Sequence, residues 1–317
     1  MYAAMQEIMT GKIDTTQIVS FLTALNKKGE SVEELTAAVT VMRRYVTKIN
    51  IKHGTILDTC GTGADNKGTF NVSTIVAFVA SGCGITVAKH GNRSVSSCCG
   101  SADILEALGV NINMAPQELE KCLNTIGIAF LFAQGLHPAM KYAMPARKQM
   151  GTRTMFNVLG PLSNPAGATH QLIGVYESRW LEILARVLGN LATVHALVVY
   201  GHDGLDEITT TTATSVCELY KGEIKNYEIK PQEFGLKEAK PEDLKGGNAT
   251  DNAAILLDVL NGKPGPKRDI VIFNAAAAIY AADKVNSIKD GIQFAIESID
   301  SGKALEKLEL LKDFSLN

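Results

Sequence analysis

The sequence predicts an α/β fold, in which a small N-terminal helical domain precedes a larger α/β domain with a mainly parallel central sheet. Three observations support this prediction. Apolar residues recur at helical spacing through roughly the first 50 residues. From Thr55 onward, short β-type runs alternate with helical stretches, which is typical of a parallel sheet flanked by helices. The chain has 317 residues, of which 46% are hydrophobic, so it is long enough to bury such a core.

The N-terminal helices carry clear start signals. Asp14 is placed to cap the helix that holds Ile18, and Ser31 forms a capping box with Glu34 at the next helix. We therefore expect a helical domain over residues 1–52.

A later helical segment, at about residues 137–152, is polar and is expected to return to the helical domain. The α/β domain then consists of residues 53–136 and 153–317, and the chain crosses the hinge between the domains more than once. The expected strands are Thr55–Thr59, Ile85–Ala88, Ile128–Phe132, Leu172–Tyr176 and Ala196–Tyr200, followed by a β-rich stretch from Thr209 to Ile229. Helices are expected from about Ser73, near Ala102–Leu108, near Asn252–Leu260 and at Ala275–Ala282.

Charge and hydropathy exclude several classes of protein. The formal net charge is -2, so there is no bulk basic field of the kind a dedicated nucleic-acid binder needs. The N-terminus has an early Glu7 and no continuous apolar stretch of a secretory signal. The most apolar run, Ile75–Ala88, is interrupted by glycines and too short to cross a bilayer. We expect a soluble cytoplasmic protein.

The cysteines show no metal-binding or redox spacing, because no two of them form a CxxC pair. We expect reduced, structural thiols rather than a metal or redox site. The six are Cys60, Cys83, Cys98, Cys99, Cys122 and Cys217.

The first segment that carries chemistry is the glycine-rich stretch from Asp58 to Thr74, between an expected strand and an expected helix. Its glycines let backbone N–H groups wrap an anion, and the start of the helix adds a positive dipole end. No Lys follows Gly68, which excludes a Walker A loop, and Asn66 replaces the third glycine of a dinucleotide fingerprint. The pattern predicts phosphate binding.

The second segment, Lys89–Asp103, follows the next expected strand. It concentrates cations, an amide and hydroxyls at the carboxyl end of a strand, where ligands bind in such folds. A solvated loop would explain the charges, but not a Lys-His-Gly-Asn-Arg run directly after a strand.

The third and fourth segments supply a guanidinium and a pair of carboxylates. Arg147 stands ten residues after His137, and an Arg can hold a carboxylate with two parallel hydrogen bonds, although a solvated helix face also explains it. Asp206 and Glu207 follow the strand ending at Tyr200, and such oxygen ligands suit Mg²⁺. Asp203 is equally explained by a turn. Pro161, Pro165 and Asn157 are interpreted as scaffold of a loop, and His53, His170, His195 and His202 as structural or surface residues.

Together the four segments resemble the anthranilate phosphoribosyltransferase family over roughly residues 12–300. The motifs that carry the resemblance are the glycine loop leading into Asn71-Val72-Ser73-Thr74, Lys89-His90-Gly91-Asn92-Arg93 with Gly100-Ser101-Ala102-Asp103, the block from His137-Pro138-Ala139-Met140 to Gly160-Pro161, and Leu205-Asp206-Glu207-Ile208.

The resemblance implies the two-domain architecture shared by class II phosphoribosyltransferases and nucleoside phosphorylases, with the active site in the hinge and a homodimer formed through the helical domain. It implies transfer of the phosphoribosyl group of phosphoribosyl pyrophosphate (PRPP) to the amine of anthranilate, with Mg²⁺, in tryptophan biosynthesis. Two alternatives are a pyrimidine nucleoside phosphorylase-like enzyme and a non-catalytic relative that binds nucleic acid. The adjacent Asp206 and Glu207 argue against the first, and the near-neutral charge argues against the second.

Matching positions assign site residues by this resemblance. PRPP would contact Gly61, Gly63, Ala64, Asp65, Thr69, Asn71, Val72, Ser73, Thr74, Lys89, His90, Gly91, Asn92, Arg93, Ser94, Val95, Ser96, Ser97 and Ser101. Anthranilate would contact Gly61, Asn92 and Arg147, with His90 and His137 nearby. Mg²⁺ would contact Ser73, Asp206 and Glu207.

Three features depart from the family pattern. Ala64 stands where the family usually has glycine, and its methyl group costs about 1 kcal/mol or more if that position needs a positive φ. Cys98 and Cys99 stand where the family usually has a basic residue and a serine, so the resemblance does not carry a phosphate contact over to position 98. By comparison with the family pattern, we expect the N-terminus to start late and to lack most of the first helix.

Overall fold

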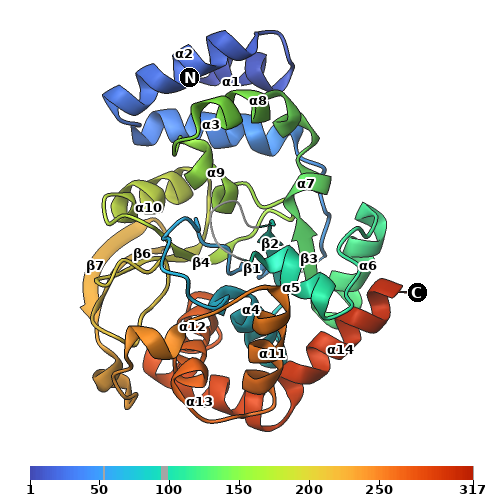
Figure 1. Cartoon of the computed structure of the whole chain (residues 1–317), viewed down its shortest axis with the longest axis vertical. Coiled ribbons are helices and arrows are strands. Elements are labelled where there is room, and N and C mark those ends of the chain that lie inside the picture. The colour runs from blue at the N-terminus through green and yellow to red at the C-terminus, as the bar shows by residue number, and fades with distance from the viewer. Residues whose placement is uncertain (53, 94–98, 317) are drawn as a thin grey trace.

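The computed structural model describes residues 1–52, 54–93 and 99–316. It has a helical part above an α/β part, with the sheet running through the middle of the molecule (Figure 1). The strands are β1 (Leu57–Asp58), β2 (Val87–Gly91), β3 (Ile128–Phe132), β4 (His170–Gly174), β5 (His195–Gly201), β6 (Thr214–Tyr220) and β7 (Glu223–Ile229). The helices are α1 (Tyr2–Met9), α2 (Thr15–Lys28), α3 (Val32–Tyr45), α4 (Val72–Gly82), α5 (Ser101–Ala107), α6 (Pro116–Ile126), α7 (Ala133–Leu136), α8 (Met144–Met150), α9 (Phe156–Leu162), α10 (Trp180–Asn190), α11 (Ala249–Leu260), α12 (Pro266–Ala281), α13 (Ile288–Asp300) and α14 (Lys303–Leu316), with 3-10 turns η1 (Pro138–Tyr142), η2 (Pro231–Phe234) and η3 (Pro241–Leu244).

The helical part forms where the capping signals predicted it. The Asp14 carboxylate accepts the backbone N–H of Gln17 at 2.8 Å at the start of α2. At α3 the Ser31 hydroxyl accepts the N–H of Glu34, and the Glu34 carboxylate accepts the N–H of Ser31 at 3.0 Å. Each cap satisfies backbone donors that a helix start leaves without partners. Both predicted caps are confirmed.

The segment after β3 returns to the helical part. Turn η1 packs against α1, and α8 packs against α2 (Figure 1). These contacts support the predicted domain boundaries, 1–52 with about 137–152 against the rest, which stay a prediction. The apolar core under these helices continues through α9 and α10 onto the upper face of β4 and β5. The two parts therefore share packed side chains.

The central sheet has the strand order β3-β2-β1-β4-β5-β6-β7. Strands β1 to β5 are parallel, and β6 and β7 add an antiparallel edge. The prediction of a mainly parallel sheet is confirmed. The chain moves outward from β1 to β3 and then crosses back to place β4 on the other side of β1. The gap beyond the carboxyl ends of β1 and β4 is therefore the topological switch point, where ligands bind in open α/β sheets.

Helices cover both faces of the sheet, which explains the near-continuous apolar strands. Helices α4 and α12 pack together below it, and α10 packs above β5 and β6 (Figure 1). The expected strand limits are close to those observed, but β4 begins two residues before Leu172, at His170. Pro161 lies inside α9 rather than in a turn. Its ring removes the N–H that would donate to the Asn157 carbonyl, and the helix ends one residue later, at Leu162.

No helix among the described residues combines the length and the apolar character that a membrane crossing requires. Cys60, Cys83, Cys122 and Cys217 are free thiols, and Cys98 lies outside the described residues.

Candidate active site

The glycine-rich segment forms a loop, residues 59–71, between β1 and α4 at the switch point. We call it the glycine loop. Its backbone enters the left-handed region at Gly63 (φ 64), Ala64 (φ 66), Asn66 (φ 57) and Gly68 (φ 67). Such a conformation costs a residue with a Cβ roughly 1–2 kcal/mol. Ala64 therefore carries the strain that the sequence suggested, and surrounding contacts must hold it there.

Consecutive residues of the glycine loop are tied to neighbouring elements. The N–H of Thr62 donates to the carbonyl of Gly174, at the end of β4, at 2.9 Å. The N–H of Gly63 donates to the Asp206 carboxylate at 2.6 Å. Gly174 must be glycine here, because a Cβ would lie 1.5 Å from the backbone oxygen of Asp206. The close approach of these backbones places Asp206 beside the glycine loop.

The start of α4 joins the first and second sequence segments. The Asn71 side chain caps α4 by accepting the N–H of Thr74 at 3.0 Å, and the Thr74 hydroxyl donates to Ser101 at 2.9 Å. From β2, the buried Lys89 donates to the Ser73 hydroxyl at 3.2 Å and to the Thr59 carbonyl at 3.3 Å. An ammonium group and a helix N-terminus thus meet at one place, which suits an anion.

Carboxylates crowd the other side of the glycine loop. Burial and the neighbouring Asp65 carboxylate raise the pKa of Asp206 to about 7. Burial and Asp206 raise the pKa of Glu207 well above its usual value, against the attraction of Lys89 and a hydrogen bond from the Ser73 backbone. The structure therefore brings together Ser73, Asp206 and Glu207, the three residues assigned to Mg²⁺ from the sequence, and adds Asp65.

This acidic cluster, Asp65 with Asp206 and Glu207, suits a divalent cation. Asp65 Oδ2 is buried and has no hydrogen-bond partner among the described residues. Lys89 attracts Glu207, but Asp206 repels Glu207 and Asp65 repels both, so further positive charge would relieve their repulsion. The cluster is too open to form an all-protein cage, which fits Mg²⁺, since that ion keeps waters and binds substrate phosphates.

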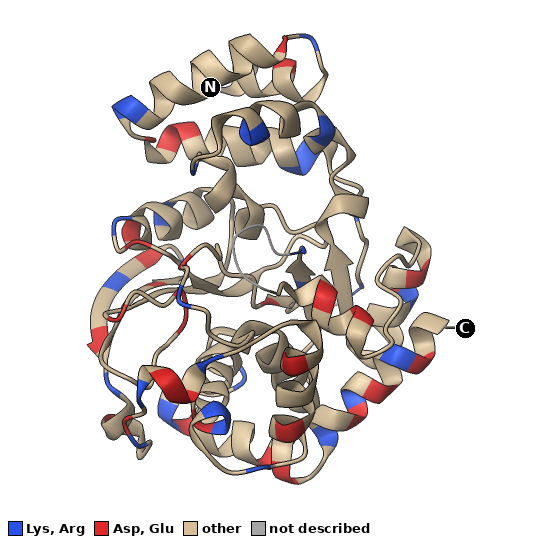
Figure 2. Ribbon diagram, viewed as in Figure 1, with Lys and Arg blue, Asp and Glu red and all other residues tan. Residues whose placement is uncertain are grey.

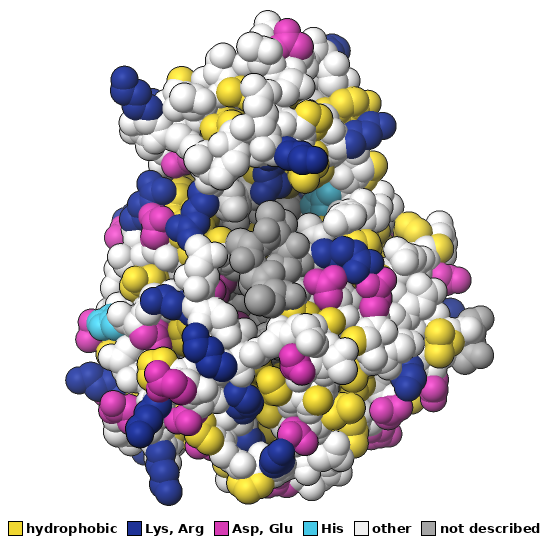
Figure 3. Space-filling model, viewed as in Figure 1, with side chains coloured by type: hydrophobic (Ala, Val, Ile, Leu, Met, Phe, Trp, Pro, Cys, Tyr) yellow, Lys and Arg dark blue, Asp and Glu magenta, His cyan; other side chains and the backbone are white. Residues whose placement is uncertain are grey.

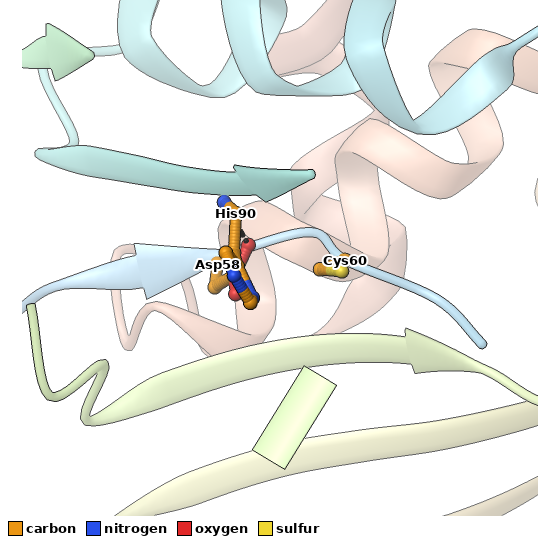
Figure 4. Close-up of side chains that lie close together, drawn as sticks. All are labelled: Asp58, Cys60 and His90. Atoms are coloured by element: carbon orange, nitrogen blue, oxygen red, sulfur yellow. Dashed lines mark hydrogen bonds between the residues drawn. The ribbon is translucent and has the colours of Figure 1, made fainter. Parts of the chain in front are cut away.

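A tighter group of potential ligands, Asp58, Cys60 and His90, lies at the end of β1 and β2 (Figure 4). It is the one such group within the described residues whose ligand atoms all lie within 4.8 Å of one another. The Asp58 carboxylate already has hydrogen-bond partners: it accepts from Asn164 at 2.7 Å and from the backbone N–H of His90 at 3.1 Å. Burial raises the pKa of the Cys60 thiol to about 12, so no thiolate is available. We interpret this group as structural.

Two buried histidines from different segments are in contact. His90 Nε2 and His137 Nε2 lie 3.2 Å apart, and burial lowers the pKa of His137 to about 4 and that of His90 well below its usual value. Both rings are therefore neutral near pH 7, and one donates to the other. His90 Nδ1 is buried without a described partner.

Arg147 and Asn92, assigned to anthranilate, both have groups free to bind it. Arg147 lies on α8 with its guanidinium 5.6 Å from the Phe156 ring centre, and it forms no salt bridge to a described residue. Burial lowers the pKa of Arg147, as expected for a cation that is partly removed from water and has no acidic partner among the described residues. The Asn92 side-chain oxygen accepts from Gln134 at 3.2 Å and from the Arg93 backbone at 2.8 Å, so its NH₂ group points elsewhere.

The side chain of Arg93 is engaged outside the glycine loop. Its guanidinium pairs with Asp103 at 2.9 Å and Glu106 at 2.7 Å, and it lies 5.7 Å from the Phe132 ring. Arg93 can therefore contact PRPP through its backbone, or through its side chain once the ion pairs with Asp103 and Glu106 have broken. The assigned residues Ser94, Val95, Ser96 and Ser97 lie outside the described residues.

Sequence reasoning gave no role to two residues that contact the site. Arg153 binds the glycine loop through the carbonyl of Ala64, and Gln134 orients Asn92. Arg153 stands within the third segment, so its charge was a visible signal, but its partner is 89 residues away. Asn157 holds the loop before α9 by accepting the N–H of Thr154 at 2.9 Å, in line with its interpretation as scaffold.

Known proteins resemble the whole chain. Residues 53–305 match the family described as "Glycosyl transferase family, a/b domain", and residues 1–46 match the helical bundle domain of that family. The chain is 50% identical to an anthranilate phosphoribosyltransferase of Petrotoga mobilis, over 99% of this chain and 92% of the relative. The chain belongs to the anthranilate phosphoribosyltransferase family.

Solved structures of anthranilate phosphoribosyltransferases have the same fold. The enzyme of Thermus thermophilus superimposes with a TM-score of 0.95 at 41% identity, covering 100% of this chain and 94% of that one. The Saccharomyces cerevisiae enzyme in complex with PRPP and Mg has a TM-score of 0.92 at 31% identity, covering 99% of this chain and 92% of that one. The chain is thus an enzyme of the glycosyltransferase family.

The surface agrees with an anthranilate phosphoribosyltransferase better than with a nucleic-acid binder. Acidic and basic residues are interspersed along the ribbon, with no extended basic stripe in this view (Figure 2). In the space-filling view, Lys and Arg side chains are scattered over both the helical and the α/β parts and are interspersed with Asp and Glu (Figure 3). Such a mixed surface lacks the continuous positive field that nucleic-acid binding needs.

Proposed function

We propose that the chain transfers the phosphoribosyl group of PRPP to the amine of anthranilate, giving N-(5-phosphoribosyl)anthranilate and pyrophosphate in tryptophan biosynthesis. The observation that carries this proposal is the convergence of the glycine loop, Lys89 and the acidic cluster at the switch point of the sheet. That arrangement combines anion donors with carboxylates for a divalent cation, which a diphosphate substrate needs.

Stabilising the departing diphosphate is the main task of the site. The bond from the ribose anomeric carbon to the diphosphate oxygen breaks, the bond to the anthranilate nitrogen forms, and the nitrogen then loses a proton. Backbone N–H groups of the glycine loop and the Lys89 ammonium stabilise the charge that develops on the diphosphate. The Gly63 N–H is bound to Asp206 in this structure, so its use by PRPP exchanges that bond.

Asp206, Glu207 and Ser73 would hold Mg²⁺, in keeping with the relative solved with PRPP and Mg. When bound, the ion supplies positive charge that neutralises the diphosphate. Without it, the carboxylates of Asp206 and Glu207 would repel the phosphates.

Arg147 and Asn92 would hold anthranilate. The guanidinium of Arg147, which has no ion pair with a described residue, would take the carboxylate in two parallel hydrogen bonds, and the NH₂ group of Asn92 would donate a third. His90 and His137, which the resemblance also assigns to the anthranilate side, contact each other as neutral rings and would add no charge that competes for the carboxylate. The amine is neutral at pH 7, so orientation rather than deprotonation is the first requirement.

We also propose a homodimer through the helical part, whose surface exposes the large apolar side chains of Tyr2, Tyr142 and Met144. The expected cytoplasmic location stays a prediction.

The direct test is an assay of the purified protein with anthranilate, PRPP and Mg²⁺, in which loss of anthranilate fluorescence reports the reaction. We expect loss that requires all three components and stops when EDTA removes the metal. A nucleoside with inorganic phosphate serves as the control for the phosphorylase alternative. If fluorescence stays constant while the nucleoside is cleaved, the proposal is wrong.

A further inference from the structure

Arg153 lies between the three parts of the molecule that must come together in catalysis. It follows α8, at the point where the chain leaves the helical part, and its backbone carbonyl accepts from Asn26 of α2 at 2.8 Å. Its guanidinium donates to the Ala64 carbonyl in the glycine loop and to the Glu177 carboxylate, 3.3 Å away, beyond β4. One residue thus contacts the helical part, the glycine loop and the α/β part.

The guanidinium of Arg153 is held in a fixed plane. It lies over the Tyr176 ring, 4.2 Å from the ring centre, while its two terminal nitrogens point to different acceptors. Tyr176 is itself bound to the glycine loop, because its N–H donates to the Thr62 hydroxyl at 3.2 Å. A planar fork that stacks and donates in two directions is a geometry that Arg provides and Lys does not.

The carbonyl that Arg153 holds belongs to the strained residue of the loop. Ala64 has φ 66, a conformation that its methyl group disfavours, and its neighbour Asn66 is also left-handed. A charge-assisted hydrogen bond to that carbonyl offsets the strain and keeps the loop in one shape. Loss of the bond would let Ala64 relax, which would move the neighbouring N–H groups of Gly63 and Asp65.

We propose that Arg153 is a positioning residue that holds the glycine loop in its anion-binding shape and couples that shape to the position of the helical part. The proposal rests on the proposed function, since it assigns the loop to PRPP. Arg153 acts through the Ala64 carbonyl, not by contact with the reacting atoms.

The first experiment compares Arg153→Ala and Arg153→Lys with the matched control Arg179→Ala. Arg179 also pairs with Glu177, at 2.8 Å, and stacks on Trp180, but neither partner belongs to the glycine loop. We expect both Arg153 variants to raise the KM for PRPP about tenfold, as for loss of one charge-assisted hydrogen bond, with less than a twofold change in the KM for anthranilate. Arg179→Ala should match the wild type, and melting temperatures should show that all variants fold.

The second experiment adds Ala64→Gly to each background. Glycine takes a positive φ without strain, so the loop keeps its shape when Arg153 is removed. We expect the effect of Arg153→Ala on the KM for PRPP to fall to about threefold or less in the Ala64→Gly background, a non-additive result. Hydrogen exchange of the loop amides should rise in Arg153→Ala and less so in the double variant.

Each negative outcome has a separate meaning. An inactive wild type would reject the proposed function and leave exchange in the loop as the test of Arg153. An active wild type with additive effects, or with Arg153→Lys equal to the wild type, would reject the positioning role. An equal rise in both KM values would indicate general loosening of the site instead.

Discussion

The two ends of the central sheet carry polar clusters of opposite character. At the carboxyl ends of the strands, Asp65, Asp206 and Glu207 crowd together, and burial with mutual repulsion raises the pKa values of Asp206 and Glu207. At the other end, where β4 and β5 begin, His195 lies between two carboxylates. Its Nδ1 is 2.6 Å from Asp283, and its Nε2 is 3.0 Å from Glu218.

The second cluster, which we call the far-end cluster, is satisfied. It comprises His170, His195, Glu218, Tyr280 and Asp283, and the Tyr280 hydroxyl donates to Glu218 at 2.7 Å. Burial alone would raise the pKa of Glu218, but hydrogen bonds from His195, Tyr280 and Tyr227 outweigh it and lower that pKa. The acidic cluster at the substrate site thus carries carboxylates whose charge is poorly compensated, whereas in the far-end cluster hydrogen bonds compensate the charge of Glu218. This contrast makes opposite predictions for the two ends.

The largest effect should come from neutralising the acidic cluster. Asp206→Asn with Glu207→Gln should lower kcat at least about 100-fold, because the residues that would hold Mg²⁺ are gone. The folded protein should be no less stable, since burial and mutual repulsion disfavour the charge of both carboxylates. Steady-state kinetics with Mg²⁺ and urea unfolding check the two halves of this prediction. Near-normal turnover would refute the metal role.

A substitution at the proposed anthranilate site should change the KM for anthranilate. Arg147→Ala should raise the KM for anthranilate far more than the KM for PRPP, by about tenfold or more, because an unpaired guanidinium is available for the carboxylate. Lys148→Ala, on the same helix, is the control. An unchanged KM for anthranilate would reject the assignment of Arg147.

The contrast also shows what the sequence could predict. The adjacent Asp206 and Glu207 after a strand and the caps at Asp14 and Ser31 follow from local patterns, because each depends on a few neighbouring residues. A positive φ at Ala64 was suggested only by the family resemblance, which has glycine there, and the structure gives that residue φ 66.

Contacts between residues that are far apart in the sequence could not be predicted. Asp206 reaches the Gly63 N–H across 143 positions, and this contact depends on the strand order that places β4 beside β1. Periodicity predicted parallel strands but not their order. The far-end cluster was equally hidden, since His195 and Asp283 are 88 positions apart and neither belongs to a motif. Histidines without a motif were expected to be structural, and the contacts of His195 fit that expectation.

For the far-end cluster we expect the reverse of the acidic cluster, namely a loss of stability with little change in kcat. Glu218→Gln should lower the free energy of unfolding by about 2 kcal/mol, the usual loss when hydrogen bonds to a buried charged group are weakened. The kcat of the folded protein should stay within about twofold of the wild type, because the cluster lies at the amino ends of β4 and β5, whereas the glycine loop lies at the carboxyl end of β1. Urea unfolding and kinetics on the same sample test both claims. A large fall in kcat without loss of stability would break the comparison.

The smallest effect should be a difference in the pH dependence of stability. The pKa of Glu218 is lower in the folded protein than its usual value of 4.5, so the folded state binds fewer protons there. Its contribution is complete above about pH 4.5 and is lost as pH falls through the lowered pKa. Unfolding of Glu218→Gln should therefore lack part of the acid-side loss of stability seen in the wild type.

Asp58, at the carboxyl end of β1, should act with the opposite sign. Burial raises its pKa from 3.8 to about 6, outweighing Lys89 and the hydrogen bond from Asn164. The folded state binds the proton more tightly, so this contribution is complete below pH 3.8 and is lost as pH rises through about 6. The stability difference between the wild type and Asp58→Asn should therefore change between about pH 4 and 6, while that for Glu218→Gln changes below pH 4.5. Parallel curves for the two variants would show that folding does not shift the pKa values of Asp58 and Glu218 in opposite directions, since only opposite shifts produce opposite slopes.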